Sequence, residues 1–337
     1  MVADYLPQLK AELERNKIKV NEKPTRSYPK ALSTGIPGRK VAQIEALAER
    51  VCESSNSDSW LEWCSGKGYL GRFLNASSRK PVTSLEYQKS LCDSGQQEAI
   101  RLGLAMHFVH GDALDPKLPL VFSPKMHAVA LHACGDLHVE LIKQAAKHKL
   151  SAVSIAPCCY HLTKDDVYQG LSEVGKRSSL NLTRNELRIP LQKTVTGGQR
   201  VSKHRYQEMS YRLGFDALLR GVLGFDEYTP VPSIKKSQLG QGFMAFCHWA
   251  SNAKGIELAE VDLTDTDFEH FQALGESRYW QMERLSLVQS AFHRLIEIWL
   301  VLDRACFLEE QDYQVELSEF CTAQTTPRNL LIHAIKK

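Results

Sequence analysis

The chain has 337 residues, a formal net charge of +3 and 43% hydrophobic residues. This length exceeds what a minimal nucleotide-binding domain needs, so we expect one catalytic domain plus an insertion. No run of about 18 apolar residues occurs and the N-terminus lacks a basic-then-apolar leader, which predicts a cytoplasmic protein without a membrane partner. The nine cysteines are scattered through apolar segments, which indicates reduced thiols and no disulfide partner.

Residues 1–58 are predicted to form an N-terminal helical extension. Helices are expected at 5–18 and 39–52. In the second helix, Val41, Ile44 and Leu47 recur at helical spacing, so one of its faces should pack on the domain that follows.

The next hundred residues alternate between strand and helix patterns. Strands are predicted at 60–64, 81–86, 107–110, 127–132 and 151–156, and helices after residue 69, at 88–102 and at 137–148. The alternation predicts an α/β fold of the Rossmann-like kind, with right-handed crossovers and a mostly parallel sheet. Ligands of such sheets bind at the carboxyl ends of the strands.

The first strand ends in a glycine-rich turn within Glu62-Trp-Cys-Ser-Gly-Lys-Gly68. Gly66 and Gly68 carry no Cβ and can take positive φ, so the turn can bring backbone amides close to an adenosine-containing cofactor. Cys64, a small side chain, is expected beside that cofactor. The spacing G-x-G-x-x-G from Gly66 to Gly71 also fits a dinucleotide, so the turn alone does not choose between cofactors.

A carboxylate is expected at the end of each of the first three strands. Glu62 can accept hydrogen bonds from the ammonium group of a methionine moiety, which NAD lacks. Glu86 can bind ribose hydroxyls, and Asp112 can accept from an adenine amino group. This series favours S-adenosyl-L-methionine (SAM), and a helix cap or a solvated turn is the alternative interpretation of each acid.

Two loops, after the fourth and fifth strands, are predicted to flank the transferred methyl group. The first contains His132-Ala-Cys-Gly-Asp136 and the second Pro157-Cys-Cys-Tyr-His161. The carbonyl of Pro157 is a candidate acceptor for a target N–H, and Tyr160 is a candidate for stacking on a base. His161 is the candidate general base, because an imidazole with a pKa near ~6.5 can take a proton at neutral pH. A structural histidine is the alternative.

The cysteines in these loops leave several roles open. Cys158 follows a proline, as in nucleophile loops of cytosine-C5 methyltransferases, but after a different strand. Cys64, Cys134, Cys158 and Cys159 are also candidate metal ligands with the two histidines, although no pair has C-x₂-C spacing and adjacent cysteines usually point apart. Small packed side chains beside the cofactor are the simplest interpretation, and no metal is predicted.

These motifs resemble class I SAM-dependent methyltransferases. More narrowly, they are similar to the subfamily that includes the tRNA 2′-O-methyltransferases of the acceptor stem and the methyltransferase domain of glutathione S-transferase C-terminal domain-containing proteins. The resemblance implies a SAM-binding domain formed by residues 59–161 and 311–337, with His132 among the residues near the cofactor. Cys64 stands where the superfamily usually has its first glycine.

The last 25 residues predict an antiparallel hairpin. Residues 313–320 alternate with period two, a turn follows, and 329–335 form a second apolar strand. Class I methyltransferases add such a hairpin to their parallel sheet, whereas a dehydrogenase would repeat its βαβ half. The hairpin is therefore the sequence feature that best separates SAM from NAD.

The intervening residues 162–310 are predicted to be a mainly helical insertion for substrate recognition, with helices at 204–223 and 278–307. Its segment 176–212 contains many more basic than acidic residues, with Tyr206 and Tyr211 available for stacking, which favours an RNA partner. A solvated basic face is the alternative. The sequence thus predicts a SAM-dependent methyltransferase acting on tRNA or rRNA. A protein methyltransferase, a non-catalytic SAM- or RNA-binding module and an NAD-dependent oxidoreductase are the alternatives.

Overall fold

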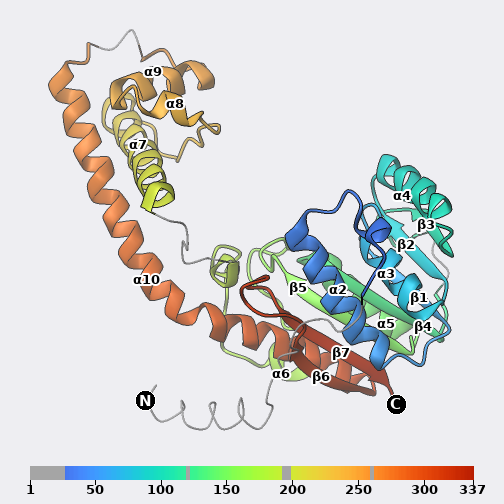
Figure 1. Cartoon of the computed structure of the whole chain (residues 1–337). Coiled ribbons are helices and arrows are strands. Elements are labelled where there is room, and N and C mark those ends of the chain that lie inside the picture. Colours follow the sequence, from blue (N-terminus) through green and yellow to red (C-terminus); the bar gives the residue numbers. More distant parts are fainter. Residues whose placement is uncertain (1–26, 119–121, 192–198, 259–261) are drawn as a thin grey trace. The chain divides into compact units, whose positions relative to one another are not determined.

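The computed structural model describes residues 27–118, 122–191, 199–258 and 262–337 (Figure 1). The chain divides into two compact units, which we call the sheet unit, Met1–Leu191 with Leu295–Lys337, and the helical unit, Gln192–Arg294. The predicted helix at 5–18 lies outside the described residues. The helical unit is smaller than the predicted insertion, because residues 162–191 and 295–310 belong to the sheet unit.

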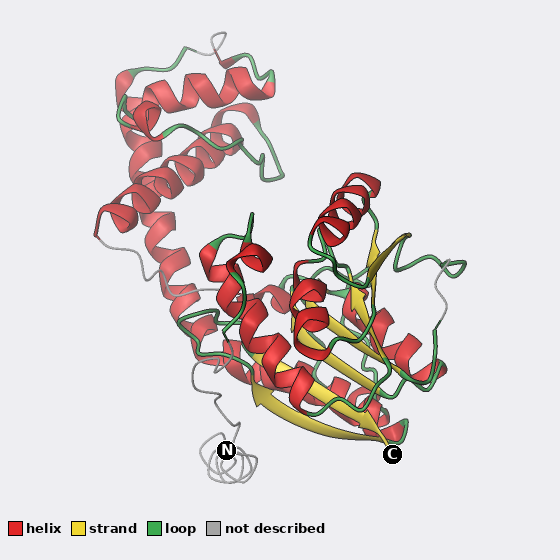
Figure 2. Cartoon of the chain, turned by 45° about the vertical axis from the view of Figure 1, so that its right-hand side comes forward, coloured by secondary structure: helices red, strands yellow, loops and turns green. Residues whose placement is uncertain are grey.

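The sheet unit is built on a seven-stranded sheet with the order β3-β2-β1-β4-β5-β7-β6 (Figure 2). Its strands are β1 (Ser59–Trp63), β2 (Val82–Glu86), β3 (Met106–His110), β4 (Met126–Cys134), β5 (Ala152–Cys158), β6 (Tyr313–Glu319) and β7 (Leu330–Lys336). The first five are parallel, and β7 pairs antiparallel with both β5 and β6. The predicted α/β fold and its terminal hairpin are confirmed.

Helices cover both faces of this sheet. The helices α2 (Gly38–Glu53), α3 (Tyr69–Ser78) and α4 (Lys89–Arg101) share one apolar core with Trp60. The helix α5 (Asp136–Lys147) and the C-terminal part of α10 (Asp265–Glu310) share the other with Leu61 and Trp63. Successive side chains of a strand point to opposite faces, so the apolar run of β1 supplies both cores.

A buried polar chain links the terminal hairpin to the parallel strands. The His127 Nε2 of β4 lies 2.8 Å from the Ser154 Oγ of β5, and that hydroxyl lies 2.7 Å from the His333 Nδ1 of β7. All three side chains are buried. Burial lowers the pKa of His127 well below its usual range and also lowers the pKa of His333. Neutral imidazoles can exchange hydrogen bonds with one hydroxyl, so the chain is consistent with uncharged histidines.

The helical unit has a core of its own. It contains α7 (Gln199–Leu223), α8 (Lys236–Leu239), α9 (Phe243–Lys254) and the N-terminal part of α10, with Phe215, Phe243 and Phe246 at the centre. Three short helices, η1 (Lys30–Ser33), α6 (Glu173–Lys176) and η2 (Glu186–Leu191), complete the described elements of the sheet unit.

The helix α10 is longer than the helix predicted at 278–307. It also contains a more apolar stretch than expected from the sequence. One 18-residue window in it has a mean hydropathy of 1.3, which by length and composition alone would suffice to cross a membrane. Near its C-terminal end, however, Leu300, Val301 and Leu308 are buried in the sheet unit, together with the charged Asp303 and Arg304. That part of the helix therefore belongs to the core of the sheet unit.

Candidate active site

The glycine-rich turn after β1 has the left-handed backbone that its sequence predicts. Cys64, Gly66 and Gly68 have φ of 55°, 58° and 69°. The N–H of Ser65 donates to the Leu85 carbonyl at 2.9 Å, and the N–H of Gly66 donates to the Glu86 Oε2 at 2.8 Å. Both hydrogen bonds attach the turn to the end of β2. Glu86 therefore holds the turn in place and also lines the cavity in front of it.

The two glycines of this turn have different surroundings. A Cβ at Gly66 would meet no atom within 4 Å, so the backbone there borders open space. A Cβ at Gly68 would overlap the ring of Phe108, a β3 residue of the apolar core. Gly66 is thus placed to approach a ligand closely, whereas Gly68, predicted to contact the cofactor, is needed for packing of the turn on β3.

Glu62 is buried and its carboxylate is already engaged. Its Oε2 accepts from the Ser84 hydroxyl at 2.7 Å, and the N–H groups of Leu70 and Gly71 also donate to the carboxylate. Burial raises the pKa of Glu62 to about 7, although these bonds and Arg72 act in the opposite direction. The residue is absent from the lining of the cavity described next, so its geometry supports positioning of the α3 N-terminus. Direct contact with an ammonium group stays a prediction.

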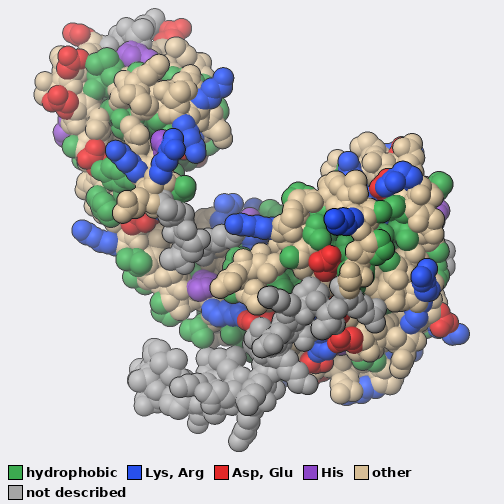
Figure 3. Space-filling model, viewed as in Figure 1, with side chains coloured by type: hydrophobic (Ala, Val, Ile, Leu, Met, Phe, Trp, Pro, Cys, Tyr) green, Lys and Arg blue, Asp and Glu red, His purple; other side chains and the backbone are tan. Residues whose placement is uncertain are grey.

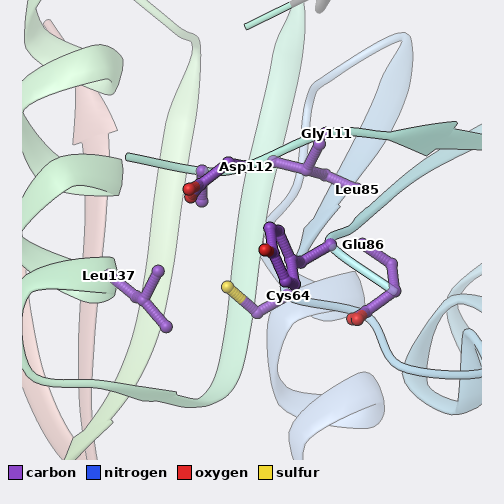
Figure 4. A pocket seen from close by; sticks show the side chains of 8 residues that line it. Cys64, Leu85, Glu86, Gly111, Asp112 and Leu137 are labelled. Atoms are coloured by element: carbon purple, nitrogen blue, oxygen red, sulfur yellow. The ribbon is translucent and has the colours of Figure 1, made fainter. Parts of the chain in front are cut away.

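A cavity of about 350 Å³ opens at the carboxyl ends of the first three strands (Figure 4). Cys64, Glu86 and Asp112, three of the predicted cofactor residues, line it together. Sequence reasoning missed its other walls, which are Leu85, Tyr87, Gly111, Ala113 and Leu137. Each of them is adjacent in the sequence to a motif residue, namely Glu86, Asp112 or Asp136. Their adjacency to these motif residues could have identified them.

The residues of this cavity fit an adenosine moiety. The Glu86 carboxylate lies at the wall, held by Gly66 and by the N–H of Gln88 at 2.9 Å, and can accept from hydroxyl donors. Asp112 lies beyond the end of β3 and its Oδ1 accepts from the Leu114 N–H at 2.9 Å, which leaves further acceptor capacity. Tyr87 and Leu137 add apolar surface for a flat ring, as small-molecule sites usually do.

His132 turns away from this cavity. A register shift in β4 gives His132 a φ of 66°, and its Nε2 lies 2.7 Å from the Oε1 of Gln43 on α2. Burial, together with Arg328 and Lys40, lowers the pKa of His132 to about 4, so the imidazole is neutral at physiological pH. These contacts give His132 a link to α2, and no described contact connects it to the cofactor cavity.

The second loop differs from the prediction in which residues are exposed. Pro157 is not in the loop but in β5, which extends to Cys158, and it is buried. Tyr160 is only 3% exposed: its ring lies edge-on to His138, with the Arg304 guanidinium 5.0 Å from the ring centre. Arg304 of α10 thus occupies one side of the Tyr160 ring, and stacking of Tyr160 on a substrate base stays a prediction.

Tyr160 does line a second cavity of about 520 Å³, together with Gly135, Asp136 and Arg304. The two cavities have walls from consecutive residues, Ala113 with Leu114 and Leu137 with Asp136. The Nδ1 of His161 is buried and has no hydrogen-bond partner among the described residues. Burial, with Arg188 and Arg328, lowers the pKa of His161, so its ring is a neutral proton acceptor at physiological pH.

Residues 39–166 match a protein family described as a methyltransferase domain. The matched residues lie in the sheet unit, which is therefore similar to that family over this range. The strand order and the position of the first cavity, at the carboxyl ends of the parallel strands, agree with this similarity. The match covers the turn, all five parallel strands and both predicted loops.

Parts of several solved structures of methyltransferases are similar to part of this chain. A Pyrococcus abyssi tRNA (uracil-54, C5)-methyltransferase, solved with S-adenosyl-L-homocysteine, is 16% identical over 35% of this chain and 29% of that one, with a TM-score of 0.29. M. capricolum TrmK, solved with the same compound, is 13% identical over 32% of this chain and 50% of that one, with a TM-score of 0.28. A SAM-dependent methyltransferase from Aquifex aeolicus is 12% identical over 39% and 72%, with a TM-score of 0.29. The chain thus spans half or less of the length of the first two.

Proposed function

We propose that this protein is an active SAM-dependent methyltransferase that modifies RNA in the cytoplasm, with tRNA or rRNA as the expected substrate. The observation that carries the transferase part is the convergence of Cys64, Glu86 and Asp112 on one cavity beside the open face of Gly66. When bound there, SAM supplies a methyl group on a positively charged sulfur. The residues of the chain then hold the donor and align the acceptor, which is the main requirement for this reaction.

The acceptor side is proposed to involve the loop after β5. The second cavity, whose walls adjoin those of the first, offers room for the target group. His161, in the loop that follows β5, is the proposed proton acceptor for a hydroxyl target, with Nε2 as the accepting atom because Nδ1 is buried. The acceptor contact proposed for the Pro157 carbonyl stays part of this hypothesis, and Tyr160 forms part of the wall.

The RNA part rests on basic side chains of the segment 176–212. Several of its cations are paired with carboxylates: Lys176 with Glu173, Arg184 with Asp166, Arg205 with Glu283 and Arg212 with Glu208. Arg200 and Lys203 are exposed near the start of α7 and are the proposed phosphate contacts. Lys and Arg side chains are visible on the face of the helical unit that carries α7 (Figure 3). Lys193 lies outside the described residues.

The aromatic part of the RNA hypothesis needs a correction. Tyr211 is buried against Phe243 and Phe246 in the core of the helical unit, so it cannot stack on a base. Tyr206 packs edge-on to Tyr279 and beside Trp280, which is 55% exposed. Trp280 is therefore the better candidate for a stacking surface.

The test is transfer of a tritiated methyl group from SAM to total RNA and to total protein from cells that lack this gene product. We expect label in RNA with the wild type and none with Glu86→Gln, which weakens the hold on the cofactor. Asp93→Asn, an exposed carboxylate on α4, is the matched control and should keep full activity. Label in protein alone would replace RNA with a protein substrate, and label in neither fraction would favour a non-catalytic binding module.

A further inference from the structure

Three thiols meet where β4 and β5 end. Cys134 is the last residue of β4 and pairs in register with Cys158, the last residue of β5. Their Sγ atoms are 3.3 Å apart, and the Sγ atoms of Cys134, Cys158 and Cys159 all lie within 4.8 Å of one another. None of the three is in a disulfide, so their thiols are available as ligands.

The backbone explains how two adjacent cysteines come to face the same point. In an extended strand, Cys158 and Cys159 would point to opposite faces of the sheet. Cys159 instead has a φ of 48°, a left-handed conformation that is uncommon for a residue other than glycine. This turn brings its side chain back toward Cys158. A strained backbone of this kind is characteristic of functional sites.

We infer that Cys134, Cys158 and Cys159 bind one zinc ion. Two thiolates on one tetrahedral zinc ion with Zn–S of about 2.3 Å stand about 3.8 Å apart. The Sγ atoms of Cys134 and Cys158 are 3.3 Å apart and all three lie within 4.8 Å of one another, so small movements of the side chains would give that spacing. Thiolates are the ligands that select zinc over harder cations. Binding converts the three thiols to thiolates and releases their protons to solvent, with no change in oxidation state.

The surroundings suit a cluster of negative charge. Arg328, in the loop before β7, is the basic side chain whose charge acts on both Cys134 and Cys159. Its Nε is buried and has no hydrogen-bond partner among the described residues. Three thiolates and one Zn²⁺ carry a net charge of −1, which an adjacent guanidinium compensates.

Three protein ligands leave the fourth position of the zinc ion open to another donor. Zinc sites with three protein ligands and a fourth position for water or substrate are typical of catalysis, whereas purely structural sites have four protein ligands. The inference rests on the cysteines alone and holds whatever the methyl acceptor is.

The test is the metal content of the full-length protein, purified under reducing conditions without chelator and analysed by inductively coupled plasma mass spectrometry. We expect about one zinc per chain for a site of this kind. Replacing the metal with Co²⁺ should give the sulfur-to-cobalt charge-transfer band that thiolate ligation produces. Cys159→Ser, a half-exposed position, should lose most of the zinc and weaken that band.

Cys306→Ser is the matched control, since Cys306 is also half-buried but lies on α10 outside the cluster, and it should keep its zinc. Cys134→Ser gives a second variant, read with its circular dichroism to verify folding. Protein that neither contains zinc nor takes up Zn²⁺ after reduction would overturn the inference. So would copper or iron in place of zinc, or a metal-free protein whose mass is lower by two hydrogens because Cys134 and Cys158 form a disulfide.

Discussion

The acid of the first motif illustrates how a buried side chain changes role with its neighbours. Glu62 stands at the position predicted for cofactor binding, yet Ser84 and two N–H groups of α3 already donate to its carboxylate. Ser84 belongs to the neighbouring strand β2, and the local sequence around Glu62 does not predict a hydrogen bond between the two residues. The motif places an acid at this position, but the hydrogen-bond partners of that acid depend on which strand lies beside β1.

The raised pKa of Glu62 predicts a measurable effect of pH on stability. Because its pKa is about 7 in the folded protein and near 4.5 when unfolded, the folded state holds this proton more tightly. The stabilisation is complete below the unfolded pKa and is lost as pH rises through about 7, by up to about 3 kcal/mol. Glu62→Gln cannot ionise, so the unfolding free energy of the wild type should fall relative to the variant between pH 5 and 8.

Chemical unfolding of both proteins at several pH values measures this difference. Other groups also contribute to the pH dependence of stability, among them His127, whose pKa burial lowers well below its usual range in the folded state, but they contribute equally to both proteins and cancel. A lost hydrogen bond in the variant adds an offset that does not depend on pH. Parallel curves for the two proteins would show that Glu62 has an ordinary pKa in the folded state.

Gly66 offers a test of the cofactor cavity that separates binding from folding. Gly66→Val should strongly weaken binding of S-adenosyl-L-homocysteine, because its side chain would enter the open space in front of the turn. Calorimetric titration measures the affinity. The left-handed backbone also makes any side chain there cost about 1–2 kcal/mol of stability, so the strain needs its own control.

Gly103→Val provides that control. Gly103 has a φ of 64°, close to the 58° of Gly66, and a Cβ there also meets no atom within 4 Å. It follows α4 and lies outside the lining of the cavity. We expect a similar loss of stability in both variants and normal ligand affinity in Gly103→Val alone. Equal affinities in the two variants would mean that the ligand does not approach Gly66.

The strands of the sheet and the helices α2 to α5 were predictable because each one has a clear periodic pattern, whereas α8 and α9 of the helical unit were not predicted. The five parallel strands and the hairpin agree with the predicted positions to within two residues at each end. Two differences, in β4 and β5, concern the proposed zinc site. Both strands extend two residues further than expected, to Cys134 and Cys158, and so bring those thiols into one ladder. The left-handed turn at Cys159 that completes the cluster leaves no signal in hydrophobic periodicity.

The buried polar chain through β4, β5 and β7 should matter for attachment of the hairpin. Ser154→Ala removes the hydroxyl between His127 and His333 and leaves a buried nitrogen on each ring without that partner. An unsatisfied buried group costs about 1–3 kcal/mol, so the variant should unfold at a clearly lower denaturant concentration. Urea unfolding monitored by tryptophan fluorescence measures the loss.

Ser318→Ala is the matched control for this variant. Ser318 is a fully buried serine of β6 whose Oγ has no hydrogen-bond partner among the described residues. The substitution removes the same hydroxyl from the same sheet without breaking a bond, so its stability should stay near that of the wild type. Similar destabilisation by the two substitutions would assign the cost to packing and not to the polar chain.

The limits of prediction are clearest for contacts between distant parts of the sequence. Arg304 of α10 lies over the ring of Tyr160, and Gln43 of α2 holds His132, 89 residues later. Both contacts join a predicted site residue to a side chain far away in the sequence, so local motifs do not reveal them. The boundary between the two units also depends on contacts between distant residues. The sequence assigns residues 295–310 to the helical insertion, but Leu300 and Leu308 are buried in the sheet unit.

Because the chain has two compact units, binding of SAM and binding of RNA can be tested separately. If the sheet unit binds SAM and α7 of the helical unit binds phosphates, the two affinities should respond to different changes. Arg200→Glu with Lys203→Glu should weaken RNA binding and reduce the slope of log affinity against log salt by about one for each lost phosphate contact. The affinity for S-adenosylhomocysteine should not change.

A second double variant, Lys236→Glu with Lys254→Glu, controls for net charge. Both lysines are exposed in the helical unit, on α8 and at the end of α9, so the charge change is the same while α7 is intact. Fluorescence anisotropy with a labelled tRNA at several salt concentrations measures all three proteins. Equal loss in both double variants would point to general attraction of the unit for RNA. Unchanged RNA affinity in both double variants would show that α7 does not contact RNA, and would favour a protein substrate.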